Sequence, residues 1–143
     1  MKEFVPFGLA KKLKEKGFRE PCVATYDIDD YDEVDYNRYV LRSAYQMNVN
    51  AKDCLQIYND EKGTLVDAPT ISQVLKWLRD EKKIFIDVAI FADHRAGGYF
   101  WGCEVYDISQ MPKHVYYKSS ILNKSDYNEA ALAGIEYVLD NLI

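Results

Sequence analysis

The stretch IFIDVAIFA at residues 84–92, followed by DHRAGG at 93–98 and YFWGCEVYD at 99–107, decides the fold of this chain. Apolar residues alternate along both nine-residue segments, which is the two-residue period of a β-strand. The linking segment contains two glycines that can adopt positive φ angles, so the two strands form a hairpin.

The alternation divides each strand of this hairpin between two faces. In the first strand, one face carries Ile84, Ile86, Val88, Ile90 and Ala92, and the other carries Phe85, Asp87, Ala89 and Phe91. In the second strand, the two sets are Trp101, Cys103 and Val105, and Phe100, Glu104 and Tyr106. Both faces are therefore mostly apolar.

Helix signals lie on either side of the hairpin. Before it, Asp67 or Ala68 is a candidate N-cap with Pro69 in the first turn, and Thr70 or Ser72 can add a side-chain cap. The helix ends at Lys82–Lys83. Its buried stripe follows helical spacing and consists of Ile71, Val74, Leu75 and Leu78; Trp77 lies off this stripe.

After the hairpin, Pro112 interrupts the chain and residues 114–118 form a third, antiparallel strand. Ser125–Asp126 with Glu129 then gives a capping box that starts a final helix. Ala131 and Gly134 allow this helix to pack closely on the sheet.

The N-terminal part predicts a helix from Pro6 to Lys16, stopped by Gly17, and a strand from Cys22 to Tyr26. The apolar residues of segment 36–58 have a mixed period, which leaves one or two strands, or a strand and a short helix. The order αβ…αβββα predicts an α+β fold: a mainly antiparallel sheet with helices packed on one face. At 143 residues, the chain is expected to be a single domain, residues 1–143.

The composition limits the classes of partner. Twelve tyrosines suit strand and contact surfaces, because a tyrosine ring buries area while its hydroxyl stays hydrated. The net charge of −5 argues against a broad nucleic-acid-binding face, which requires clustered lysine and arginine. No apolar run approaches the length of about 18 residues that spans a bilayer, so no membrane association is expected.

The three cysteines, Cys22, Cys54 and Cys103, form neither a disulfide framework nor a zinc pair. Together with an N-terminus that lacks the apolar core of a signal peptide, they predict a reducing, cytoplasmic location. No cofactor is expected.

An acidic run occupies residues 27–35. A calcium loop requires glycine at its sixth position and glutamate at its twelfth, where this chain has Asp32 and Arg38. A solvated loop is therefore favoured over a metal site, and an acidic contact surface for a basic partner is the alternative.

The hairpin loop Asp93-His94-Arg95 offers an acid, an imidazole and a guanidinium on one turn. Such a loop can bind an anion through Arg95 and His94, or perform acid–base chemistry through His94. A polar hairpin loop with no binding or catalytic role is the more common case. A Cys103–His114 pair is a weaker hypothesis, because Cys103 lies in an apolar strand and is favoured as a structural cysteine.

Aromatic residues are numerous enough to suggest a contact patch, namely Trp77, Phe85, Phe91, Tyr99, Phe100 and Trp101. If helices cover only one face of the sheet, the other face needs cover from elsewhere in the chain or from a second copy. Symmetric homodimers are the commonest solution. The candidate binding residues are therefore Asp93, His94 and Arg95 of the loop, with Trp77 and Trp101.

Three segments resemble a group of uncharacterised small proteins of gut Bacteroidales and their phages or mobile elements. The segments are LAKKLKEKGF at 9–18 with Pro21-Cys22; Ala68-Pro69-Thr70 with Val74, Trp77-Leu78-Arg79 and Lys82; and Tyr127 with Glu129-Ala130, Gly134-Ile135 and Leu142-Ile143. This resemblance implies a phage-related cytoplasmic protein and brings no site residues.

Residues 84–143 are also similar, at the level of fold, to HicB-like antitoxin domains, which share three strands followed by a helix that opens with Tyr/Glu-Glu-Ala. The chain lacks the glycine-cysteine turn expected after the second strand of that family, and its strand lengths differ. Fold-level likeness does not transmit function.

The sequence favours a non-enzymatic protein-interaction or binding module of prophage or mobile-element type, acting as a homodimer or on another protein. The alternatives are a small enzyme that uses the His94/Arg95 loop, with a metal on the acids at 29–32, and a nucleic-acid-associated regulator. Sequence alone identifies neither the partner nor the structure of residues 36–66.

Overall fold

The computed structural model describes residues 3–28, 39–43 and 66–143. The chain divides into two compact units, Glu3–Thr70 and Ile71–Ile143. The order of elements confirms the predicted α+β fold, and all strand pairs in the described residues are antiparallel. The assignment of the chain to one domain stays a prediction.

In the first unit, helix α1 (Phe7–Glu15) begins after Pro6 and ends as expected. Gly17 has a φ of 92°, and the backbone N–H of Phe18 donates to the carbonyl of Leu13 at 2.9 Å. This closure satisfies a terminal carbonyl of the helix and returns Phe18 to the core, where it is buried.

Strand β1 (Ala24–Ile28) starts two residues later than predicted and is central in a sheet of order β2-β1-β3. Its neighbours are β2 (Tyr39–Ser43) and β3 (Val66–Asp67). Of the segment 36–58, only β2 lies within the described residues. The acidic run lies outside them beyond Ile28.

Helix α3 (Ile71–Glu81) starts later than the sequence predicted. Asp67 pairs with Thr25 of β1, and the N–H of Ala68 donates to the Ala24 carbonyl at 2.9 Å. These residues complete a sheet, so the prediction that Asp67 or Ala68 caps the helix was wrong. The predicted stripe is confirmed at Ile71, Val74 and Leu78, which are buried.

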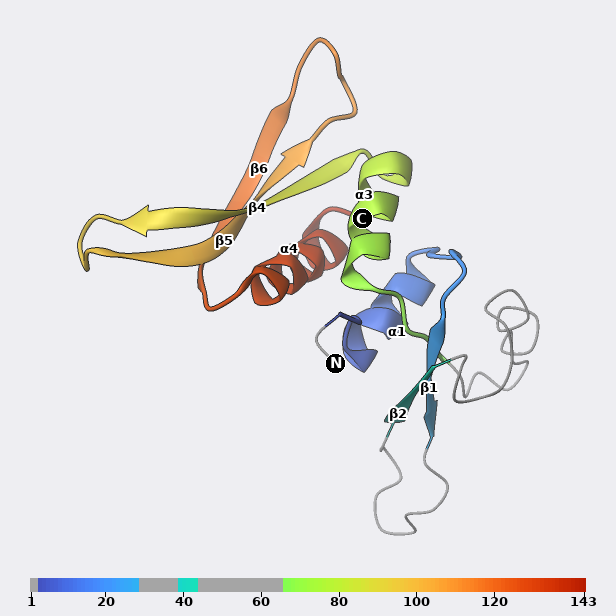
Figure 1. Cartoon of the computed structure of the whole chain (residues 1–143). Coiled ribbons are helices and arrows are strands. Elements are labelled where there is room, and N and C mark those ends of the chain that lie inside the picture. The colour runs from blue at the N-terminus through green and yellow to red at the C-terminus, as the bar shows by residue number, and fades with distance from the viewer. Residues whose placement is uncertain (1–2, 29–38, 44–65) are drawn as a thin grey trace. The chain divides into compact units, whose positions relative to one another are not determined.

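In the second unit, β4 (Ile84–Asp93) and β5 (Gly98–Asp107) form the predicted hairpin. Their register pairs Ile86 with Val105 and Asp87 with Glu104. Paired residues share a face of an antiparallel sheet, so the predicted division into two faces is confirmed. The far end of the hairpin extends beyond the helices of this unit (Figure 1).

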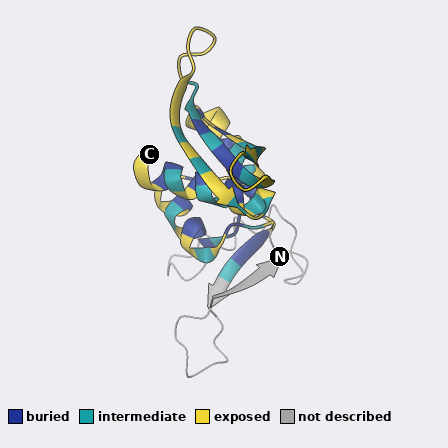
Figure 2. Ribbon diagram, turned by 90° about the vertical axis from the view of Figure 1, so that its left-hand side faces the viewer, coloured by how far each residue is buried: buried dark blue, intermediate teal, exposed yellow. Residues whose placement is uncertain are grey.

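Strand β6 (Tyr116–Lys124) pairs with β5 and completes a sheet of order β4-β5-β6. It begins two residues later and ends six residues later than predicted. Two register shifts interrupt the β5–β6 ladder, one between Trp101 and Cys103 and one between Val105 and Tyr106. Exposed residues line this strand and the loop before it (Figure 2).

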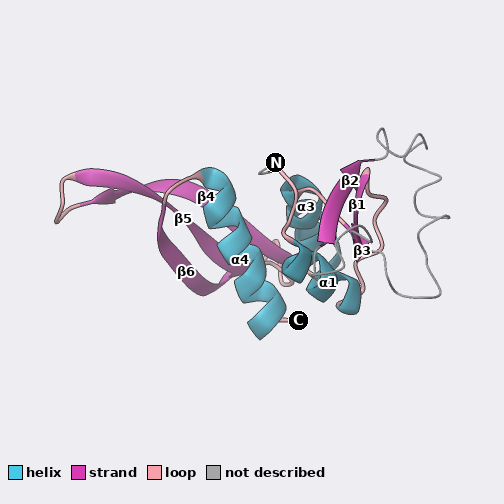
Figure 3. Ribbon diagram, turned by 90° about the horizontal axis from the view of Figure 1, so that it is seen from below, coloured by secondary structure: helices cyan, strands magenta, loops and turns pink. Residues whose placement is uncertain are grey.

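Helix α4 (Tyr127–Asn141) begins at the predicted capping box. The Asp126 carboxylate accepts from the N–H of Glu129 at 2.8 Å, and the Glu129 carboxylate accepts from the N–H of Ser125 at 2.9 Å. The helix contacts all three strands of the β4–β5–β6 sheet (Figure 3).

The contact between α4 and the sheet depends on Gly134. A Cβ atom at this position would lie 2.8 Å from both the Sγ atom of Cys103 and the Cγ2 atom of Ile86. Heavy atoms do not approach so closely without displacement. The absence of a side chain therefore sets the distance between the helix and the sheet, as the sequence predicted for Gly134.

We expect Gly134→Ala to lower the free energy of unfolding by up to about 2 kcal/mol. Overpacking a core costs about 1–3 kcal/mol, and the preference of about 1 kcal/mol for alanine over glycine within a helix offsets part of this cost. Chemical denaturation measures this change. Adding Cys103→Ala removes one of the clashing atoms, so the double variant should be less destabilised than the sum of the single variants. Additive losses would contradict the close contact.

Candidate functional site

The β4–β5–β6 sheet has two unlike faces. The inner face, toward α4, carries buried Ile84, Ile86, Cys103 and Val105. The outer face consists of Phe85, Asp87, Ala89, Phe91, Phe100, Gly102, Glu104, Tyr106, Tyr117, Ser120 and Leu122. Phe85 is 39% exposed and Tyr117 56% exposed, so the described elements leave apolar side chains of this face open to solvent.

Aromatic rings occupy both ends of the outer face. Phe91 stacks on Phe100 with ring centroids 5.9 Å apart, and Tyr106 meets Tyr117 edge to face at 5.7 Å. Both separations lie in the range of favourable aromatic pairs. Local contacts therefore hold these rings in place on the sheet.

Two carboxylates lie between the aromatic ends. Asp87 and Glu104 are directly paired across β4 and β5, and neither forms an ion pair with another described residue. Like charges in this position destabilise a sheet. The Tyr106 hydroxyl donates to the Oε2 atom of Glu104 at 2.5 Å, and this bond, followed by desolvation and the charges of Glu104 and Asp87, raises the pKa of Tyr106 to about 12.

A groove of about 440 Å³ opens on the same face. Phe85 and Tyr106 come from the sheet, and the loop between β5 and β6 contributes apolar side chains. The lining residues are Arg79, Phe85, Asp87, Tyr106, Ile108, Met111 and Val115. The groove thus combines an apolar surface with one guanidinium and one carboxylate.

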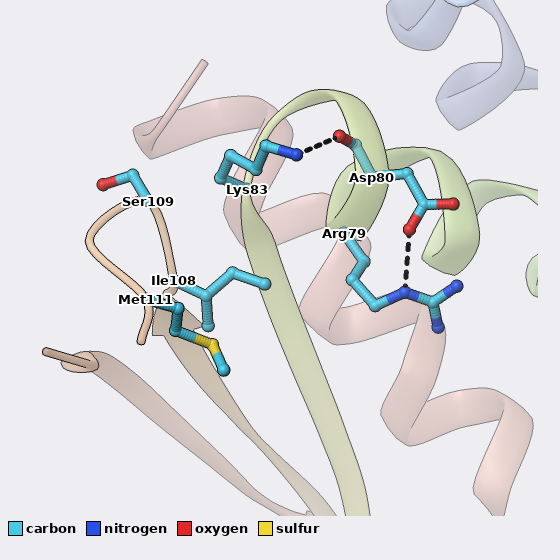
Figure 4. A pocket seen from close by; sticks show the side chains of 6 residues that line it. All are labelled: Arg79, Asp80, Lys83, Ile108, Ser109 and Met111. Carbon is cyan, nitrogen blue, oxygen red and sulfur yellow. Dashed lines mark hydrogen bonds and ion pairs between the residues drawn. The ribbon is translucent and has the colours of Figure 1, made fainter. Parts of the chain in front are cut away.

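A second cavity of about 450 Å³ shares Arg79, Ile108 and Met111 with this groove (Figure 4). The backbone explains why the end of α3 lies near the β5–β6 loop. Lys83 has a φ of 57°, which turns the chain directly from α3 into β4, and its carbonyl accepts from the N–H of Ile108 at 2.9 Å. The loop is thereby tied to the start of β4.

The predicted hairpin site forms a tight turn that is separate from the groove. The Oδ1 atom of Asp93 accepts from the N–H groups of Ala96 and Arg95 at 3.0 and 2.9 Å, and these bonds lower the pKa of Asp93. His94 and Arg95 are exposed. Asp93 therefore shapes the turn, and a binding role for His94 and Arg95 stays a prediction.

The two predicted tryptophans do not join the hairpin loop or the outer face. Trp77 is buried, with the Nζ atom of Lys82 5.1 Å from its ring centroid. Trp101 pairs with Ile90 on the inner-face side and meets Tyr127 edge to face at 5.8 Å. Their roles in binding stay predictions.

Several groove residues were missing from the predicted site, namely Arg79, Asp87, Met111 and Val115. The alternation already assigned Asp87 to the second face of β4, and Glu104 and Tyr106 to the second face of β5, and the register of the two strands brings these faces together. Sequence offered no comparable signal for Met111 and Val115, because they reach the groove through the conformation of a loop.

Cys103 is buried against α4, as favoured for a structural cysteine, and His114 is exposed in the loop before β6. Burial raises the pKa of the Cys103 thiol to about 11, and Lys124 opposes this shift. Cys103 is therefore a poor nucleophile near neutral pH.

Within residues 3–28, 39–43 and 66–143, no three or more His, Cys, Asp or Glu residues gather closely enough to hold a metal ion. The same residues include no helix with the length and apolar character needed to cross a membrane. No protein-family model, curated protein or solved structure matches this chain. The resemblances to Bacteroidales proteins and HicB-like domains stay predictions.

We expect Cys103 to resist alkylation in the folded protein. A thiol with a pKa of about 11 is ionised in about one molecule in a thousand at about pH 8. Iodoacetamide labelling followed by peptide mass spectrometry measures the modification at each cysteine separately. Denaturant should accelerate labelling of Cys103 by more than about 100-fold. Equal rates in folded and denatured protein would contradict this burial.

We expect Tyr106 to lose its proton near pH 12, and Glu104→Gln to lower that pKa toward 10. Because the folded-state pKa is raised, this group's contribution to stability is complete below about pH 10 and is lost as the pH rises through about 12. NMR titration of ¹³C-labelled tyrosine, assigned with Tyr106→Phe, measures the shift. An unchanged pKa in Glu104→Gln would contradict the proposed cause.

Proposed function

We propose that this chain is a non-enzymatic protein-interaction module that uses the outer face of the β4–β5–β6 sheet as its contact surface. The observation that supports this function is the exposed aromatic face with its apolar groove. Helix α4 covers the opposite face, where Gly134 lies against Ile86 and Cys103.

Physical chemistry favours such a surface as a binding site. Removing apolar area from water contributes about 25 cal/mol per Å². Aromatic residues and methionine are enriched in the cores of protein interfaces, whereas a polar surface rim contributes less. Phe85, Tyr106 and Met111 offer these residue types in one groove.

The groove also differs from a typical small-molecule site in how it is built. Met111 and Val115 are more than half exposed, and they lie on a loop at its border. Small-molecule sites bury most of the ligand surface. A shallow apolar border suits side chains that project from another protein.

The proposal includes a cytoplasmic location and a phage-related or mobile-element origin. The buried thiols of Cys22 and Cys103 support a reducing compartment. The origin is supported only by the segments that resemble Bacteroidales phage proteins.

Peptides selected from a random library on the purified chain test the contact surface. We expect selected peptides to bind in the groove, so that Met111→Asp weakens their binding by at least about 10-fold, or about 1.4 kcal/mol. Met111 is 57% exposed on a loop, so this substitution should preserve the fold. Isothermal titration calorimetry measures the affinity.

Tyr99→Asp is the matched control. Tyr99 is 80% exposed and does not line the groove, so its variant should bind the peptides with unchanged affinity. In a chain that light scattering shows to be monomeric, peptides that bind both variants as tightly as the original chain would overturn the proposed contact surface.

A further inference from the structure

Asp87 and Glu104 of the outer face form no ion pair with any described lysine or arginine, although the two carboxylates face each other across two strands. Tyr106 supplies one hydrogen bond to Glu104, which does not neutralise its charge. A partner that brings a positive charge to this position would relieve the repulsion.

The same groove presents a cation with unused hydrogen-bonding capacity. Arg79 is about half exposed, and its Nε atom donates to the Oδ1 atom of Asp80 at 2.9 Å. Its two terminal nitrogens have no hydrogen-bond acceptor among the described residues. Arginine favours two-pronged contacts with carboxylates, so this group is suited to an acidic partner surface.

We infer that the occupant of the outer face is a second copy of this chain, arranged so that Arg79 of each copy meets Asp87 and Glu104 of the other. This inference rests on the proposed function. It assigns a partner to the outer face and the groove, and it assigns the charges that orient that partner.

Two-fold symmetry makes this arrangement reciprocal. In a symmetric dimer, residue i of one copy contacts residue j of the other, and residue j of the first contacts residue i of the second. One groove that carries both Arg79 and Asp87 can therefore form two equivalent charge contacts. Between these contacts, the exposed Phe85 and Tyr117 side chains of both copies would lose water.

The reciprocal charges also favour this occupant over an unrelated apolar partner. A purely apolar surface would cover the rings and leave Asp87 and Glu104 without an opposite charge. Burying unpaired charges is strongly unfavourable. A second copy supplies both signs of charge and an aromatic surface at once.

Charge reversal tests the inference in the full chain. Light scattering should give the mass of a dimer for the unchanged chain. Arg79→Glu makes the groove uniformly acidic, and Asp87→Arg makes it basic. We expect each variant alone to dissociate at least about 10-fold more readily, because like charges then meet across the interface.

Mixing the two variants gives the decisive result. An acidic groove should pair with a basic groove, so an equimolar mixture should form a heterodimer that native mass spectrometry identifies by its mass. Restoration by mixing excludes misfolding as the reason for dissociation. Arg95→Asp and Glu136→Arg change charge at exposed positions outside the groove and should leave the dimer intact.

Other outcomes separate this inference from the proposed function. A monomeric unchanged chain, or a dimer that tolerates both groove reversals, overturns the inference. Peptide binding that is lost in Met111→Asp would then still support the outer face as a contact surface for a different protein. Failure of both experiments would overturn both proposals.

Discussion

The second unit of this protein depends on how closely α4 approaches its sheet. Gly134 lets the helix backbone lie against Cys103 and Ile86, where even a methyl group would collide with both side chains. The helix therefore contacts all three strands and helps to bury Ile86 and Cys103 of the inner face. Close packing of this kind leaves little room for adjustment, since protein cores approach the density of organic crystals.

This one-sided packing determines what the other side of the sheet presents. Successive residues of a strand point to opposite faces, so burial of Ile84 and Ile86 directs Phe85 and Asp87 outward. The outward set is rich in aromatic rings rather than uniformly polar. The sheet thus has two apolar faces, and α4 covers one of them.

The hairpin could be predicted in detail because its faces follow from the order of residues and one short turn. Gly134 and the capping box were equally local signals. The predicted start of α3 was wrong. Pro69 suits the first turn of a helix, but hydrogen bonds between β1 and the residues before Pro69 hold that segment in a sheet. Local preference yields to such tertiary pairing.

The groove could not be predicted for a related reason. Its wall comes from Met111 and Val115, whose positions depend on the loop after β5 and its bond to Lys83. Likewise, β6 continues through the polar residues Ser119 and Ser120 because they pair with β5. Pairing partners and loop conformations are properties of the folded chain, and a short sequence window does not contain them.

The pairing of Asp87 with Glu104 does not stabilise a single chain, because two negative charges face each other across the strands. A residue of opposite charge at either position would favour the same hairpin. Natural sequences tend to break such local rules where a surface has a function. Here the unfavourable pair lies beside exposed rings and the incompletely paired Arg79. A partner with complementary charge would offset the repulsion and bury the rings in the same contact.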